Sequence, residues 1–170
     1  IAVSYRYDAA ERRFSLTVKQ NGELHFPLSI GLLDGGGNDI VDTVLEVTKG
    51  EETFVFDDIA EEPAVSLNRH FSAPLIIEAS YTYDDYIFLM AHDNDPFARW
   101  DAGQELSSRV VMALIDDMHS GRDLVLDERY IAAFAAILDD ADIDDAFKAV
   151  ALSIPSEGSF AEKQDIIDYD

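Results

Sequence analysis

Residues 94–114, NDPFARWDAGQELSSRVVMAL, mark the point at which the sequence changes from one kind of secondary structure to another. Large apolar residues recur here at three- and four-residue intervals, as on one face of a helix: Pro96, Phe97, Trp100, Leu106, Val110, Val111 and Leu114. Asn94 or Asp95 suits the N-cap position, and Pro96 suits the first helical position. We therefore predict a long helix that ends before Gly121.

The residues before this stretch alternate between apolar and polar types, which is typical of strands with one buried face. Turn-forming segments such as Asn21-Gly22, residues 34–38 and Lys49-Gly50 separate the alternating runs. The predicted strands centre on residues 3–7, 14–18, 26–32, 44–47, 53–56 and 75–79. Short strands at regular spacing predict an antiparallel β-sandwich.

The residues after Tyr83 favour helices. The apolar run at residues 86–90 fits either a buried strand or a short helix, and Asp84 and Asp85 favour a helix because they suit its cap. Asp127 is placed to cap a helix whose apolar face is Tyr130, Ile131, Phe134 and Leu138. Asp144 or Asp145 is placed to open another, with the apolar residues Ala146, Phe147, Val150 and Leu152. A further helix is expected to begin within residues 160–170, so the helical part needs a partner for its apolar faces.

Composition limits the classes of function. With 170 residues, 48% of them hydrophobic, the chain can form one ordinary domain or two small ones around a packed core. The formal charge of −23 repels phosphate backbones and anionic lipids, so neither nucleic acid nor membrane partners are expected. No apolar run approaches the roughly 18 residues of a membrane span, and no secretory leader is visible. The absence of cysteine favours a reducing compartment, and we expect a cytoplasmic protein.

Metal and phosphate sites have weak support in the sequence. His25, His70, His92 and His119 do not show the spacing that lets two imidazoles bind one metal. Asp140, Asp142 and Asp144 imitate a calcium loop, but Asp145 replaces its glycine and Ala151 its glutamate, so helix capping is the better interpretation. Residues 35–37, three glycines, are interpreted as a hairpin turn because no helix begins there to bind phosphate.

Acid–base and nucleophilic sites are equally weak. Ser72, Ser107 and Ser153 lack the Gly-x-Ser-x-Gly elbow that exposes a nucleophile. The neighbouring pairs Asp116-Asp117 and Asp139-Asp140 point in different directions on a helix, so we interpret them as exposed charge. The sequence therefore predicts no catalytic, metal or substrate-binding residue in this chain. An acidic interaction or calcium-binding module remains the alternative.

The most distinctive segment, residues 92–104, is interpreted as packing at a boundary between two domains. We expect Phe97, Arg99, Trp100 and Asp101 to form a structural interdomain joint, with the two large aromatics buried beside Arg99. The boundary itself is expected between a sandwich at residues 1–83 and a helical domain at residues 84–170.

Three blocks in this order and spacing resemble the bacterial aminopeptidase N family of zinc metallopeptidases: residues 53–57, 63–75 and 92–104. The Phe-Ser-Ala-Pro and Asp-Pro-Phe-x-Arg-Trp motifs carry the likeness, which continues to residues 154–156 and 165–168. The resemblance implies an immunoglobulin-like β-sandwich followed by the start of a superhelical, repeat-like α-helical domain. It also supports a helix at residues 86–90.

The catalytic motifs of that family, Gly-x-Met-Glu-Asn and His-Glu-x-x-His, do not occur in these 170 residues. The resemblance therefore implies a non-catalytic piece of a larger hydrolase, inactive by itself and without a cofactor of its own. Zinc would belong to the parent enzyme, which removes N-terminal amino acids from peptides. The implied partners are the catalytic domain and the remaining C-terminal helices of the same polypeptide.

Overall fold

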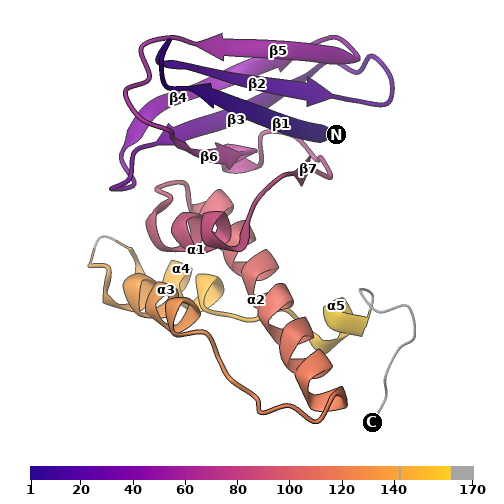
Figure 1. The fold of residues 1–170 in the computed structure, drawn as a ribbon, viewed down its shortest axis with the longest axis vertical. Coiled ribbons are helices and arrows are strands. Elements are labelled where there is room, and N and C mark those ends of the chain that lie inside the picture. The colour runs from indigo at the N-terminus through magenta and orange to yellow at the C-terminus, as the bar shows by residue number, and fades with distance from the viewer. Residues whose placement is uncertain (142, 162–170) are drawn as a thin grey trace.

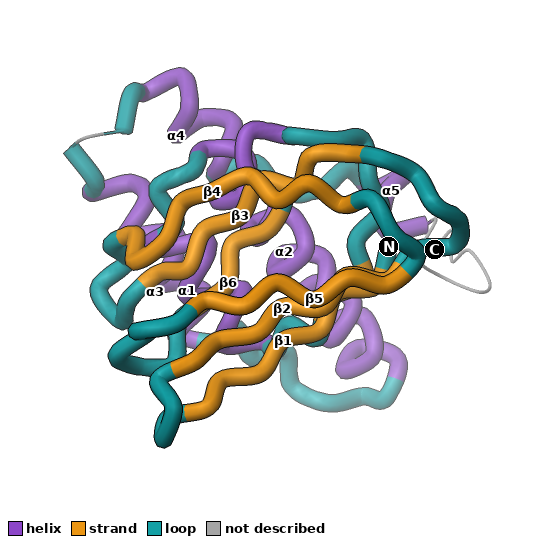
Figure 2. The backbone as a smooth tube through the Cα atoms, turned by 90° about the horizontal axis from the view of Figure 1, so that it is seen from above, coloured by secondary structure: helices purple, strands orange, loops and turns teal. Residues whose placement is uncertain are grey.

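The computed structural model describes residues 1–141 and 143–161, and shows a β-sandwich stacked on a helical part (Figure 1). One sheet has the order β5-β2-β1-β7 and the other the order β4-β3-β6, seen as two groups of strands in Figure 2. The first sheet contains β1 (Ala2–Asp8), β2 (Arg13–Lys19), β5 (Glu51–Phe56) and β7 (Glu78–Ala79). The second contains β3 (Phe26–Leu33), β4 (Asp39–Val47) and β6 (Ala64–Leu67).

The sandwich core confirms the alternating pattern of the sequence. Phe14, Leu16 and Val18 of β2 point inward and are buried, as period-two alternation requires. In β3, by contrast, every residue from Leu28 to Leu33 is buried. Leu28, Ile30 and Leu32 pack in the sandwich core, whereas Leu33 on the opposite face packs with the helices. Strand β3 is thus covered on both faces, and its second face supports the helical part.

Two strand predictions need correction. Strand β6 was not predicted; it is short and follows Pro63 directly. A strand was predicted at residues 75–79, but only Glu78 and Ala79 pair with a neighbour, Ala2 and Val3 of β1. This pairing is parallel, so the sandwich is not wholly antiparallel as expected, because the chain returns beside β1 in the same direction. The other five predicted strands are confirmed.

The helical part contains α1 (Tyr83–His92), α2 (Pro96–His119), α3 (Glu128–Asp139), α4 (Asp145–Ala151) and α5 (Glu157–Ala161). The predicted caps Asp95, Asp127 and Asp144 each accept a hydrogen bond from a backbone N–H of the first turn. Residues 86–90 lie in α1, which confirms the helix. Its N-cap is Thr82, however, and Asp85 completes a capping box from inside the helix. The predicted helix at residues 160–170 lies outside the described residues beyond Ala161, as do residues 165–168.

The buried face of α3 differs in part from the prediction. Tyr130 and Phe134 pack in the helical core as predicted. Tyr130, Ala133 and Ile137 are buried against α1 and α2, while Ile131 and Leu138 are exposed. On α4, Val150 is likewise exposed and Ala151 buried. Ala133 and Ala151 are small side chains that let the neighbouring helices approach closely. Among the described residues, no helix has both the length and the apolar character needed to cross a membrane.

Candidate functional site at the joint between sandwich and helices

A tight loop between β6 and β7 carries the residues that join the two parts. Asn68, His70 and Phe71 all have positive φ angles, 56°, 57° and 50°. Such backbone is costly for residues other than glycine and persists only where surrounding contacts enforce it. The Asn68 side chain supplies such contacts, accepting from the backbone N–H of Ala73 and donating to its carbonyl oxygen. The loop thereby directs Arg69 into the interior.

Arg69 is the centre of the joint, with only 2% of its surface exposed. Its Nε donates to Ser66 Oγ at 3.0 Å, which ties it to β6. Its Nη2 lies 2.8 Å from Asp39 Oδ1 on β4 and 3.0 Å from Asp93 Oδ1 at the end of α1. Asp42 is a weaker, exposed partner at 3.4 Å. One guanidinium therefore connects two strands of the sandwich, β4 and β6, with the end of the first helix.

The two close carboxylates of this cluster differ in their surroundings. Burial disfavours ionisation of Asp39, but hydrogen bonds from Arg69 and Asn94 outweigh it and lower the pKa of Asp39. Desolvation dominates at Asp93, which is completely buried, and raises its pKa although Ser66, the Asp95 N–H and Arg69 act in the opposite direction. Its Oδ2 has no hydrogen-bond partner among the described residues. An ionised carboxylate at Asp93 therefore costs more folding free energy than one at Asp39.

Asp95 attaches the start of α2 to the same loop. One of its oxygens caps the helix by accepting from the Ala98 N–H at 2.8 Å, and the side chain also accepts from the His70 N–H at 3.2 Å. His70 Nδ1 lies 2.7 Å from Asp95 Oδ2. The carboxylate is 2% exposed. It thus acts as a helix cap and as a bridge across the joint.

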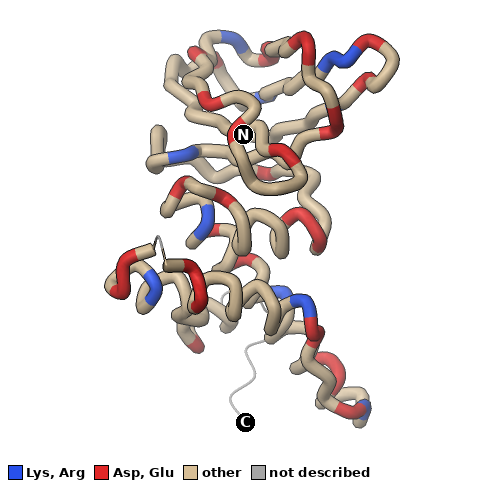
Figure 3. The backbone as a smooth tube through the Cα atoms, turned by 90° about the vertical axis from the view of Figure 1, so that its left-hand side faces the viewer, with Lys and Arg blue, Asp and Glu red and all other residues tan. Residues whose placement is uncertain are grey.

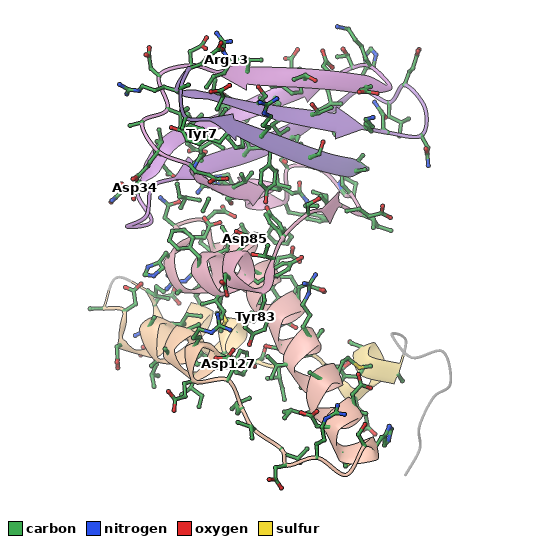
Figure 4. All side chains as sticks on the ribbon, in the orientation of Figure 1. Tyr7, Arg13, Asp34, Tyr83, Asp85 and Asp127 are labelled. Carbon is green, nitrogen blue, oxygen red and sulfur yellow. The ribbon has the colours of Figure 1, made fainter. Side chains whose placement is uncertain are left out.

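Apolar contacts surround these polar groups. The ring of Phe71 lies 5.1 Å from that of Phe97, and the Tyr81 hydroxyl donates to the Val65 carbonyl at 2.7 Å. A second set of contacts joins α1 to α3, and Figure 4 shows Tyr83 of α1 near Asp127 at the start of α3. Arg129 of α3 lies over the Tyr83 ring and pairs with Asp84 of α1. The helices thus bind each other as well as the sandwich.

The four residues expected at the joint occupy different places. Phe97 reaches across it to Phe71, as described above. Arg99 is buried but bonds within the helical part, to the carbonyls of Met90 and Ala91 and to Asp140. Trp100 is half-buried and Asp101 exposed, and both line a groove beside the joint. Asp93 and Asp95 lie in the predicted boundary segment 92–104 but were not named as joint residues, and Arg69 was missed.

This groove has a volume of about 1150 Å³ and lies between the sandwich and α2. Its walls include Leu75 and Ile77 ahead of β7, Tyr86 of α1, and Trp100 and Gln104 of α2. Pro155 and Ser159 also line it. The groove is thus built from segments on both sides of the joint.

The glycine-rich turn, the three serines and the aspartates near residue 142 make structural contacts. Asp34 accepts from the N–H groups of Gly36 and Asn38, so residues 34–38 form a turn. The three serine hydroxyls bond to Asn68, Tyr130 and the Val150 carbonyl, respectively. Asp140 pairs with Arg99 and Asp144 caps α4, while Asp142 lies outside the described residues. Within the described ranges, no three His, Asp or Glu side chains converge as a metal site.

Comparison with known proteins assigns both parts of the chain. Residues 1–80 match the family described as a domain of unknown function (DUF3458) with an Ig-like fold. Residues 83–170, more than half of the chain, match the family described as a domain of unknown function (DUF3458_C) with ARM repeats. The expected immunoglobulin-like sandwich and repeat-like helical domain are therefore confirmed.

Curated relatives and a solved structure extend this likeness. Aminopeptidase N of Escherichia coli is 34% identical over 99% of the chain and 21% of its own length, and that of Haemophilus influenzae is 27% identical over 100% and 22%. Aminopeptidase A of Legionella pneumophila, solved in complex with aspartic acid, matches with a TM-score of 0.82 and 32% identity over 96% of this chain and 19% of that one. The chain thus spans about a fifth of the length of these relatives. It belongs to the DUF3458_C family of ARM-repeat domains, with an Ig-like DUF3458 domain ahead of it, and is homologous to a portion of bacterial aminopeptidase N.

Proposed function

We propose that this chain is the non-catalytic structural portion of a zinc-dependent aminopeptidase that removes N-terminal amino acids from peptides. The observation that carries the proposal is the match in sequence and fold to about a fifth of aminopeptidases from several bacteria. Because the match covers only about a fifth of each relative, we place the catalytic groups in the remainder of the polypeptide.

The residues of this chain do not fit a zinc site. The sequence has no His-Glu-x-x-His segment, and its histidines are dispersed over the described structure. His70 binds Asp95 at the joint, and His92 packs its ring against Phe88. We therefore place zinc and the catalytic groups in other parts of the parent polypeptide, and we assign no chemical step to this chain.

The mechanical role rests on the joint. Arg69, buried in the sandwich part, donates to Asp93 of the helical part, and separating the two parts would leave this buried guanidinium without its acceptor on the helical side. The partners that we propose are the catalytic domain and further helices of the same polypeptide. Exposed apolar residues on and ahead of α3 suit stacking of another ARM repeat: Leu124, Val125, Leu126, Ile131 and Leu138.

The surface and composition support two further parts of the proposal. Acidic residues are spread over both the sandwich and the helices (Figure 3), as expected for a solvated surface. The absence of cysteine from the sequence supports a cytoplasmic location.

The test uses the complete polypeptide that contains these 170 residues. It should release arylamine from an alanyl-arylamide, lose this activity to a chelator and regain it with zinc. Arg69→Met should lower kcat/KM while the bound zinc stays at the wild-type level, because the joint is loosened and the metal ligands lie elsewhere. Val55→Ala, on the exposed face of β5, is the control and should change neither quantity.

Two results would contradict the proposal. The first is failure of the complete polypeptide to hydrolyse the substrate, and the second is loss of the bound zinc in Arg69→Met. The alternative of a calcium-binding module would be favoured instead if calorimetry showed tight calcium binding to the 170-residue chain together with a stabilised fold.

A further inference from the structure

The loop between β2 and β3 carries the only Asn-Gly pair of the sequence, Asn21-Gly22. Residues 21–25 are exposed, and Gly22 has a φ angle of 130°, a backbone conformation that favours glycine. A Cβ added to Gly22 would meet no atom within 4 Å, so the space around this residue is open. The pair thus lies at an accessible loop tip, where covalent changes of a chain are best tolerated.

Gln20 holds the base of this loop closed. Its Nε2 donates to the carbonyl oxygens of Leu24 and Lys49 at 2.9 and 3.0 Å, and its Oε1 accepts from the Leu24 N–H at 3.0 Å. Among the described residues, neither the Asn21 carboxamide nor the Gly22 N–H has a hydrogen-bond partner. The tip of the loop can therefore change conformation while its base stays closed.

The other three asparagines are restrained. Asn38 Nδ2 donates to both carboxylate oxygens of Asp34, and Asn94 Nδ2 donates to Asp39 Oδ2 at 2.8 Å. Asn68 is buried, and its amide forms two hydrogen bonds with the backbone. Each of the three is followed by an aspartate or an arginine, whose side chain crowds the next backbone nitrogen. Position 21 therefore combines a free carboxamide with an unhindered nitrogen, and the other three do not.

We propose that Asn21 is a site of spontaneous deamidation in the folded protein, with water as the co-reactant. The Gly22 nitrogen, after losing its proton to water, forms a bond to Cγ of Asn21, and the bond from Cγ to Nδ2 breaks so that Nδ2 leaves as ammonia. Water then adds to one of the two carbonyl carbons of the cyclic imide, the bond from that carbon to the nitrogen breaks, and the nitrogen regains a proton. Opening at Cγ gives aspartate at position 21, and opening at the backbone carbonyl carbon gives isoaspartate.

The modification changes the charge and the length of the loop. Both products add one negative charge to a chain of formal charge −23. Isoaspartate also lengthens the main chain by one carbon at the loop tip. Because Gln20 closes the loop through Leu24 and Lys49, neither change removes a hydrogen bond of the sandwich. The modified protein therefore stays folded, and the reaction does not depend on the proposed aminopeptidase role.

Mass spectrometry of the complete polypeptide tests the proposal. The polypeptide is incubated in mildly alkaline buffer and digested with trypsin, and an unincubated sample digested identically gives the baseline. One tryptic peptide, residues 20–49, contains both Asn21 and Asn38, so its fragment ions compare a free and a restrained asparagine within one molecule. We expect aspartate and isoaspartate to accumulate at position 21 while Asn38 stays unmodified. A synthetic peptide of residues 15–28 gives the rate for the unfolded segment, and the folded polypeptide should react within about tenfold of that rate.

Asn21→Gln is the matched control variant. Glutamine would have to close a larger ring, so this variant should form no product at position 21. Its urea midpoint should equal that of the wild type, because position 21 is exposed. A folded-state rate more than about tenfold below that of the synthetic peptide would overturn the proposal, because the fold would then restrain the pair. Equal rates at Asn21 and Asn38 would also overturn it, as would aspartate without isoaspartate, which indicates direct hydrolysis without attack by the Gly22 nitrogen.

Discussion

The guanidinium of Arg69 lies where a side chain at Gly31 would stand. A Cβ added to Gly31 would be 2.1 Å from Cζ of Arg69 and 2.4 Å from its Nε. Gly31 is on the face of β3 that supports the helices, next to the buried Ser29 and Leu33. The missing side chain of one residue thus provides the channel through which the other reaches Asp93.

Gly31→Ala should destabilise the chain strongly. The methyl group would displace Arg69 from its carboxylate partners, with an expected loss of about 3 kcal/mol in the free energy of unfolding. Gly35→Ala is the matched control, because a Cβ at that position meets no atom within 4 Å. Its effect should stay within about 0.5 kcal/mol in urea denaturation. Equal losses for both variants would show that Arg69 moves aside at no cost.

Asp93→Asn should not destabilise the chain at neutral pH. Because burial raises the pKa of Asp93 in the folded state, its ionised form opposes folding above that pKa, and acidification relieves this cost. Asparagine imitates the protonated acid, so the variant should equal or exceed the wild type in urea midpoint at pH 7, and the difference should shrink as the pH falls. A midpoint well below the wild type at pH 7 would contradict this assignment.

Asp39→Asn should show the opposite pH dependence. The folded-state pKa of Asp39 is lowered, so its stabilisation is present above the unfolded pKa and is lost as the pH falls through the folded value. The variant should therefore be less stable than the wild type at pH 7 and approach it in acid. A constant difference between the two urea midpoints at all pH values would refute the role of the Asp39 charge.

Asp95→Ala should cost more than the loss of an ordinary helix cap. Removal of the Asp127 cap of α3 should cost about 1 kcal/mol, a typical value for a single cap. Asp95 also holds His70 across the joint in a buried setting, so its removal should cost about 2 kcal/mol. Hydrogen exchange should additionally quicken at the His70 amide in Asp95→Ala and remain unchanged there in Asp127→Ala.

Much of the fold could be predicted from local patterns. Alternation at Phe14, Leu16 and Val18 identified β2, and Asp95 with Pro96 identified the start of α2, because side-chain period and capping act within a few residues. β6 was missed because so short a strand is defined by its pairing with β3. Residues 75–77 have the apolar, β-branched composition of a strand, but no neighbouring strand pairs with them.

The joint could not be predicted in this way. Arg69 and Asp93 are 24 positions apart, and charged residues are usually interpreted as exposed. The Phe-Ser-Ala-Pro block follows shortly after Arg69, and the Asp-Pro-Phe-x-Arg-Trp block follows shortly after Asp93. Gly31 within an apolar strand was a usable signal that another group approaches the backbone closely there. Without the tertiary contacts, nothing in the sequence connected Arg69, Asp93 and Gly31.

The corrected face of α3 gives a simple test of packing. Ile137 is completely buried and Leu138 is 60% exposed. Ile137→Ala should therefore cost about 3 kcal/mol in the free energy of unfolding, whereas Leu138→Ala should change it by no more than about 0.5 kcal/mol. The reverse order would restore the face inferred from the sequence.

The most direct test of the account asks whether the 170-residue chain performs any chemistry of its own. The purified chain is incubated with zinc and an alanyl-arylamide, and E. coli aminopeptidase N serves as the positive control for the assay. We predict that arylamine release by the chain equals that of buffer with the same zinc. Zinc-dependent release that increases with the concentration of the chain would contradict the conclusion that these residues form a structural support.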